Sequence, residues 1–167
     1  MRKLIYLVAI TLGFNCSEEK KPPFDLPENS KTFLTGNSTK TWKLARRFNN
    51  KTRMNMGDCF LSYKVTYSVN GEILDNNGEQ DDCGDSMRSA WSFYTSEDNY
   101  PYIKLKGGNI QELMKLDKDY KFFKILDLTE EQMVLEFQHK QFSNKTTTIV
   151  DVFVPKDAVV KDRKFHW

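Results

Sequence analysis

The stretch LSYKVTYSVNGEILD, residues 61–75, is the clearest indication of the fold. In residues 61–69 apolar side chains occupy every second position and polar side chains lie between them, which is typical of a β-strand with one buried face. Asn70-Gly71 follows directly, and this dipeptide favours a type I′ turn. We therefore expect residues 72–75 to return as the second strand of a hairpin.

Short alternating segments continue on both sides of this hairpin. A first strand is expected to begin near Trp42 and Leu44 and to reach Phe48. Beyond the polar loop at about 75–86, further strands are expected at residues 88–95, 102–106, 110–116, 120–128, 132–140 and 146–154. About eight strands with short connections predict an all-β fold, an antiparallel up-and-down β-barrel that is closed or nearly closed.

Two of these segments have a helical alternative. Ile110, Leu113 and Met114 are spaced so that they would share one face of a helix. Residues 129–131, Thr-Glu-Glu, either form a turn between two strands or begin a short helix capped by Thr129. We expect a strand at 110–116 and a turn at 129–131.

The beginning of the chain, MRKLIYLVAITLGFNCSEEK, is typical of a lipoprotein signal peptide. Arg2 and Lys3 precede an apolar segment that is too short to span a bilayer, and Cys16 follows it. We expect residues 1–15 to be removed and Cys16 to carry a diacylglycerol and an amide-linked acyl chain such as palmitate, which together anchor stably. Cleavage nearby as an ordinary secreted protein is the alternative. The acidic residues after Cys16 favour the outer membrane, facing the periplasm or the medium.

Composition divides the rest of the chain into three parts. Residues 16–39 are polar and contain Pro22, Pro23 and Pro27, which predicts a lipid-anchored linker. Residues 40–155 hold the expected barrel, and residues 156–167 form a C-terminal tail. Without residues 1–15 the 25 basic residues fall to 23 and balance the 23 acidic ones. The basic excess that nucleic-acid binders carry is absent, so we expect no nucleic-acid partner.

The two remaining cysteines, Cys59 and Cys83, are expected to form a disulfide. Export places them in an oxidising compartment, and neither belongs to a Cys-x-x-Cys motif. Two buried free thiols are the alternative. A bridge between positions 59 and 83 would stabilise the fold by about 3 kcal/mol in the chain-entropy model.

Four motifs in this order resemble bacterial lipocalin-like domain lipoproteins. They are TWKL at residues 41–44, DCFLSYKVTYSVNGEILDNNGEQDDC at 58–83, AWSF at 90–93 and ILDLTEEQMVLEF at 125–137. The resemblance covers most of residues 40–154, and it implies an up-and-down β-barrel whose interior can hold a small apolar ligand. It implies no particular ligand, since most members of the family have no assigned substrate.

Several aromatic residues are candidates for the end or the lining of a barrel cavity. Trp42 resembles the tryptophan that plugs the closed end of a lipocalin barrel. The other candidates are Tyr63, Tyr67, Trp91, Phe93, Phe122, Phe137 and Phe153. They line a cavity or simply fill the core, and a filled core is the more economical interpretation because a small barrel needs bulky inward side chains.

Catalytic, metal and cofactor sites are not expected. His139 falls within a strand and His166 lies beside the carboxyl terminus, and the chain has no Gly-x-Ser-x-Gly, HExxH or glycine-rich phosphate motif. The acidic loop that begins at Asp75 departs from the EF-hand pattern. We therefore expect a binding protein and no enzyme.

The expected function is to bind or carry a small apolar or amphipathic ligand in the envelope, held at the membrane through Cys16. The alternative is an interaction module with a packed barrel that binds another envelope or host protein through its loops. An internal cavity favours the carrier, and a filled core favours the module.

Overall fold

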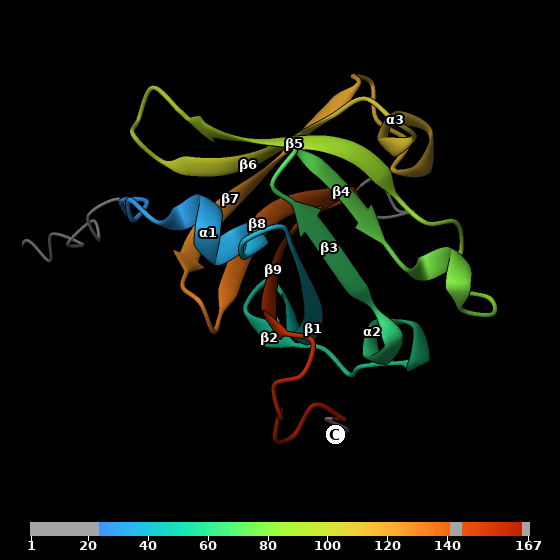
Figure 1. Ribbon diagram of the computed structural model, residues 1–167. Coiled ribbons are helices and arrows are strands. Elements are labelled where there is room, and N and C mark those ends of the chain that lie inside the picture. The colour runs from blue at the N-terminus through green and yellow to red at the C-terminus, as the bar shows by residue number, and fades with distance from the viewer. Residues whose placement is uncertain (1–23, 141–144, 165–167) are drawn as a thin grey trace, which may run out of the picture.

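The computed structural model describes residues 24–140 and 145–164, in which eight strands close into an antiparallel up-and-down barrel (Figure 1). Each barrel strand pairs with the next along the chain, and β9 pairs with β1. The barrel strands are β1 (Thr39–Asn49), β3 (Lys64–Ser68), β4 (Glu72–Asp75), β5 (Arg88–Thr95), β6 (Pro101–Lys106), β7 (Tyr120–Leu128), β8 (Met133–Lys140) and β9 (Thr146–Pro155). A two-residue strand, β2 (Thr52–Arg53), pairs with the end of β1. The predicted fold class is confirmed.

Alternation along each strand builds the core. In β3, Val65 and Tyr67 are buried, whereas Lys64 is exposed. The buried positions of all strands meet in one apolar cluster inside the barrel. Its fully buried members include Leu44, Ile103, Ile125, Leu128 and Met133.

The predicted strand at 61–69 begins later than expected. Leu61 and Ser62 belong to the short helix α2 (Asp58–Ser62), in which the Leu61 amide donates to the Gly57 carbonyl at 2.9 Å. Leu61 and Tyr63 both pack against the core although only Lys64 onward is extended. The apolar alternation therefore continues across a change of backbone conformation, which pattern alone does not reveal.

The turn after β3 is of a different type from the one predicted. Gly71 has φ +90°, but Asn70 is not among the residues with positive φ, whereas a type I′ turn needs positive φ at both central residues. The Gly71 amide donates to the Ser68 carbonyl at 3.0 Å, as in the three-residue hairpin loop that combines a type I turn with a bulge. Two consecutive positive φ angles occur instead at Asn50 and Lys51, between β1 and β2.

The predicted strand at 110–116 is wrong, and its helical alternative is confirmed. Ile110 begins the short helix α3 (Ile110–Leu113) and is fully buried, and Leu113 and Met114 pack against the core. Gly107 and Gly108 precede the helix with positive φ. A Cβ atom at Gly108 would lie 1.9 Å from the Arg88 carbonyl oxygen, so position 108 accommodates only glycine.

The predicted turn at 129–131 is confirmed. β7 ends at Leu128 and β8 begins at Met133. Between them the Thr129 hydroxyl accepts hydrogen bonds from the amides of Glu131, at 3.2 Å, and Gln132, at 3.0 Å. The hydroxyl that could have capped a helix therefore stabilises the hairpin.

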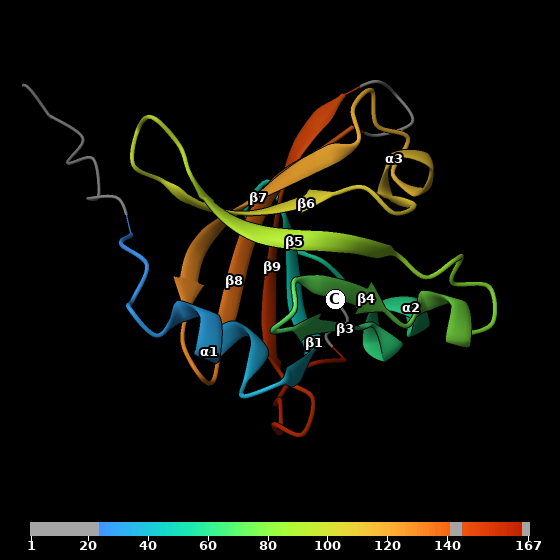
Figure 2. The same cartoon turned by 45° about the horizontal axis from the view of Figure 1, so that its top comes forward.

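Part of the expected linker is structured. Residues 30–35, within the predicted 16–39 segment, form helix α1 (Ser30–Thr35), in which Leu34 is fully buried. The helix ends at Gly36, which has φ +59°. Figure 2 shows α1 across one end of the barrel and α3 at the other. The predicted signal peptide, residues 1–15, and Cys16 lie outside the described residues.

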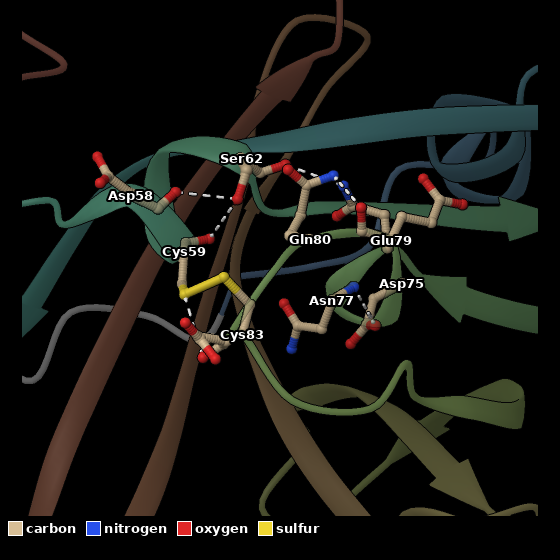
Figure 3. Close-up of a disulfide and its surroundings, with 10 residues drawn as sticks. Asp58, Cys59, Ser62, Asp75, Asn77, Glu79, Gln80 and Cys83 are labelled. Carbon is tan, nitrogen blue, oxygen red and sulfur yellow. Dashed lines mark hydrogen bonds between the residues drawn. A yellow bond between two sulfur atoms is a disulfide. The ribbon is translucent and has the colours of Figure 1, made fainter.

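The predicted disulfide between Cys59 and Cys83 is present, with 5.4 Å between the two Cα atoms. It ties α2 to the loop that follows the 3₁₀ helix η1 (Asn77–Glu79), as Figure 3 shows. In the same region the Ser62 hydroxyl donates to the carbonyls of Asp58 and Cys59. The bridge therefore fixes the long connection between β4 and β5 against the helix that leads into β3.

The chain beyond β9 folds back on the barrel. The Arg163 guanidinium donates to the Leu44 carbonyl at 2.8 Å and to the Phe60 carbonyl at 3.4 Å. Val159, between β9 and Arg163, is 95% exposed. No helix in the described part of the chain is long and apolar enough to cross a bilayer.

Candidate functional site

The barrel end opposite α1, on the side of α3, contains charged side chains that face inward, and it is called the open end below. A β-bulge between Leu44 and Arg46 shifts the register of β1 against β9. Because a bulge adds one residue, it reverses which side chains face the interior. Arg47 therefore pairs with the buried Asp151 of β9, on the same face as the core residue Phe153.

Arg47 and Asp151 form a bidentate ion pair inside this end. The Arg47 Nε atom donates to Asp151 Oδ1 at 2.6 Å, and Nη2 donates to Oδ2 at 2.5 Å. The Arg47 side chain is 20% exposed and that of Asp151 is 4% exposed. Burial raises the pKa of Asp151, and the hydrogen bonds and charge of Arg47 oppose that rise. Burial also disfavours the charge of Arg47, but the hydrogen bonds that its guanidinium donates to Asp151, together with the charge of Asp151, raise the pKa of Arg47 overall.

Lys121 is the second cation at the open end. Its Nζ lies 4.8 Å from the ring centre of Phe137 and 5.5 Å from that of Phe123, and these two rings pack edge to face at 5.0 Å. Burial, followed by repulsion from Arg47, lowers the pKa of Lys121, and attraction to Asp151 opposes this. In the described part of the chain Lys121 has no ion-pair partner within bonding distance.

Two buried polar atoms at this end have no hydrogen-bond partner among residues 24–140 and 145–164. They are Oδ1 of Asn49 and Oγ1 of Thr147. Thr147 pairs across the sheet with His139, whose pKa is lowered by burial and by the charges of Lys121 and Arg47. Buried polar atoms are normally satisfied, so this end has hydrogen-bonding capacity to offer a ligand.

A hydrogen-bonded pair lies next to the charged group. The Tyr63 hydroxyl donates to Oδ2 of Asp75 at 3.3 Å, and Oδ1 of Asp75 accepts from the amides of Met87 and Asn77. Burial raises the pKa of Asp75, whereas these hydrogen bonds lower it. Burial, then the charge of Asp75, raises the pKa of Tyr63 well above its ordinary value. In the sequence Asp75 stands at the start of an acidic loop. In the structure its hydrogen bonds link the end of β4 to the beginning of β5.

The predicted aromatic candidates divide between the two faces of the barrel. Tyr67, Trp91 and Phe153 are buried in the core, and Tyr63 and Phe93 are half-buried against it. Phe137 lies under Lys121 at the open end. Phe122 does not line the interior, because it pairs with the outward Lys104 and packs on Tyr94.

Trp42 lies at the end of the barrel that α1 covers. Its side chain is fully buried, and its indole Nε1 donates to the Leu34 carbonyl of α1 at 2.9 Å. The Lys40 ammonium lies 4.1 Å from the indole centre and donates to the Phe33 carbonyl. Through these contacts Trp42 closes the barrel end beneath α1 and holds the helix there.

Two depressions in the surface of the described residues are open to solvent. One of about 560 Å³ lies beside the β1–β2 turn and is lined by residues including Asn49, Arg53 and Met54. Another of about 270 Å³ lies between Phe24 and the β5–β6 loop. The interior near α1 is filled by side chains such as Trp42 and Met133, both fully buried or nearly so.

Sequence reasoning did not single out Arg47, Lys121 or Asp151. For Asp151 a signal existed: in residues 147–153 the odd positions are buried, and a carboxylate stands among Thr147, Ile149 and Phe153. For Arg47 no such signal was available, since its inward direction depends on the bulge at Ala45. Lys121 lies two residues before the half-buried Phe123, in a part of β7 where residues on both faces are half-buried, so alternation does not show that Lys121 faces inward.

No protein-family model matches this chain, and no curated protein matches it. Among solved structures, it is similar to a lipocalin-like protein from Bacteroides uniformis, with 14% identity and a TM-score of 0.46 over 73% of this chain and 97% of that one. It is also similar to an uncharacterized protein from Bacteroides eggerthii, with 12% identity and a TM-score of 0.39 over 70% of this chain and 97% of that one.

Proposed function

We propose that this protein is a lipid-anchored lipoprotein of the bacterial envelope whose lipocalin-like barrel binds a small amphipathic molecule with an anionic group at the open end. The observation that carries the proposal is Lys121, a half-buried cation that lies over Phe123 and Phe137. Its charge is disfavoured by burial and by Arg47. An anionic group beside Lys121 would compensate this charge, and the apolar part of the same molecule would contact the two rings.

The packing of the barrel supports a shallow site. Leu34, Trp42 and Leu128 fill the end under α1 and are fully buried. Half-buried aromatic rings and the partnerless atoms of Asn49 and Thr147 lie at the open end. The ligand therefore lies across the open end, and the site needs neither a cofactor nor a chemical reaction.

The membrane is the other partner in this proposal. The proposed attachment to the membrane rests on Arg2, Lys3 and the short apolar segment before Cys16, a pattern typical of lipoprotein signals. The anchor places the protein in the envelope, and the acidic residues Glu18 and Glu19 after Cys16 favour the outer membrane.

Replacing Cys16 with alanine is expected to move the protein from the membrane fraction to the soluble fraction, because the residue that carries the diacylglycerol and the amide-linked acyl chain is lost. Fractionation of cells and mass spectrometry of the intact protein measure this. A Cys16→Ser variant should behave in the same way. Unchanged membrane retention of both variants, or an unmodified Cys16 in the parent, would contradict the proposed anchor.

Replacing Lys121 with methionine is expected to weaken binding of laurate about 10-fold to 100-fold, the effect of losing a charge-assisted contact. Dodecanol has the same chain without the anion, and its affinity should be unchanged. Titration calorimetry on the full chain, with both probes, measures the difference. The matched control is Lys43→Met, since Lys43 pairs with Val154 on the outer face of the barrel.

The same site predicts a pH dependence. Burial lowers the pKa of Lys121 below the ordinary lysine value, so the affinity for laurate should fall as the pH rises through that lowered pKa. The charged and titratable groups around Lys121 are Arg47, Asp151 and His139. Lys121→Arg should abolish this alkaline fall. Equal affinities for laurate and dodecanol in the parent would contradict an anionic ligand.

A packed-barrel interaction module is the second candidate function. The observation in its favour is the dense packing of the core, in which Ile103, Ile125 and Met133 are fully buried. If neither laurate nor dodecanol binds and the acylated protein releases no small molecule on denaturation, the module becomes the better proposal.

A further inference from the structure

The outside of the barrel carries a cluster of aromatic rings over three neighbouring strands. Tyr94 of β5, Tyr102 of β6, and Tyr120 and Phe122 of β7 form this outer aromatic face. The ring centres of Tyr94 and Phe122 are 4.9 Å apart, those of Tyr102 and Phe122 5.9 Å, and those of Tyr120 and Phe122 5.4 Å. Tyr94 is 42% exposed. Apolar ring surface is thus available on a sheet face that the core does not use.

Lysines are interleaved with these rings. The Lys104 ammonium lies 5.1 Å from the ring centre of Tyr120 and 5.6 Å from that of Phe122. The Lys124 ammonium lies 3.5 Å from the ring centre of Tyr100. The outward positions of β5 and β6 add Arg88 and Lys106, both exposed. Carboxylates also border this face, among them Glu136 opposite Lys124 and Asp98, whose charge acts on Tyr102.

The described chain begins beside the β5–β6 loop, which adjoins this face. Phe24, Asp25 and Leu26 share an open depression with Thr95, Asn99 and Pro101 of the β5–β6 loop. Figure 1 shows the blue start of the chain at the same side of the molecule as that loop. Only eight positions separate Cys16 from Phe24, and a fully extended chain of that length spans about 28 Å at most. An anchor at Cys16 would hold the β5–β6 loop near the bilayer.

We propose that the outer aromatic face, with Lys104 and Lys124, docks on an anionic lipid surface and orients the barrel against the membrane. Tyrosine and phenylalanine rings suit the boundary between headgroups and acyl chains, because one part of them is apolar and tyrosine adds a polar tip. Lysines beside them attract anionic headgroups, and each contributes about fivefold to binding near such a surface. The reach of the tether rests on the proposed anchor, whereas the chemistry of the face does not.

A lipid surface fits this face better than a soluble polyanion does. The four rings offer broad apolar contact in addition to charge, and the adjoining chain leads toward the proposed acylated residue. A soluble polyanion would use the lysines but would leave Tyr94 and Phe122 exposed.

The test uses the full chain with Cys16→Ser, so that binding does not depend on acylation. Flotation with vesicles of phosphatidylcholine, alone or mixed with phosphatidylglycerol, measures lipid binding. We expect preference for the anionic vesicles, a loss of about 25-fold in the Lys104→Gln/Lys124→Gln variant, and a further loss when Tyr94→Ser is added. The matched control is Lys43→Gln/Arg46→Gln on the outer face of β1, which should bind as the parent does.

Three outcomes would overturn the proposal. The first is equal vesicle binding by the parent and the Lys104→Gln/Lys124→Gln variant. The second is loss of heparin binding in that variant with vesicle binding unchanged, which would assign the face to a soluble polyanion. The third is a dimer of the parent that this variant abolishes, without vesicle binding, which would assign the face to a second copy. Lys121→Met should leave vesicle binding unchanged, because Lys121 does not belong to the outer aromatic face. The ligand proposal can therefore fail while the membrane-docking proposal stands.

Discussion

Replacing Trp42 with alanine is expected to lower the free energy of unfolding by about 3–5 kcal/mol, the range for deleting a buried large aromatic side chain. The indole is fully buried, donates to the Leu34 carbonyl of α1, and lies under the Lys40 ammonium. Its removal would leave a cavity and an unpaired carbonyl, and it would remove one of the contacts that hold α1 on the barrel. Chemical denaturation of the full chain measures the loss.

Two variants separate the parts of this effect. Trp42→Phe keeps much of the packing but loses the hydrogen bond to Leu34, which should cost about 1–3 kcal/mol. Trp91→Phe is the matched control, because the Trp91 indole also donates to a carbonyl, that of Ser68, but lies 7% exposed on another strand. If Trp42→Ala leaves stability unchanged and weakens laurate binding instead, Trp42 contacts the ligand and does not seal the barrel.

The architecture was predictable because most strands carry one buried face. Residues 88–95 and 120–128 were predicted as strands and coincide with β5 and β7. Alternation of period two follows from the geometry of a single strand, so it can be recognised in the sequence without knowing which strands pair with it. The disulfide followed from compartment and cysteine count, which also need no tertiary information.

The errors occur where tertiary packing decides local structure. Leu61 and Ile110 are apolar and lie in segments that alternate, yet both are in short helices that cover the barrel. α1 was missed because its six residues hold only a few apolar side chains, of which Leu34 becomes buried through contact with Trp42. Such short helices depend on packing more than on propensity.

The candidate site was harder to predict for the same reason. The aromatic candidates were found by residue type, but Phe122 faces outward, because face assignment depends on the register with Lys104. The inward direction of Arg47 follows from a single bulge. Strands are identified by apolar residues at inward positions, and charged residues in the barrel interior break that pattern. A prediction from the pattern therefore overlooks the charged residues at the open end.

Replacing Asp151 with alanine is expected to destabilise the protein by about 3–5 kcal/mol, because it removes one partner of a buried ion pair. Asp151 is 4% exposed and holds both donors of Arg47. Its loss would leave Arg47 and Lys121 as neighbouring cations, and the pKa of Lys121 should fall further, since attraction to Asp151 now opposes the effect of burial. Urea denaturation at neutral pH measures the change in the free energy of unfolding.

The double replacement Arg47→Met/Asp151→Leu should cost far less than Asp151→Ala alone and can even stabilise the fold by about 1–4 kcal/mol, because apolar side chains avoid the desolvation of both charges. Asp151→Asn is the control of similar shape that removes only the charge. If Asp151→Ala costs less than about 1 kcal/mol, the pair behaves like an exposed one. Water would then reach Arg47, and its guanidinium would join Lys121 as a second contact for the anionic group of the ligand.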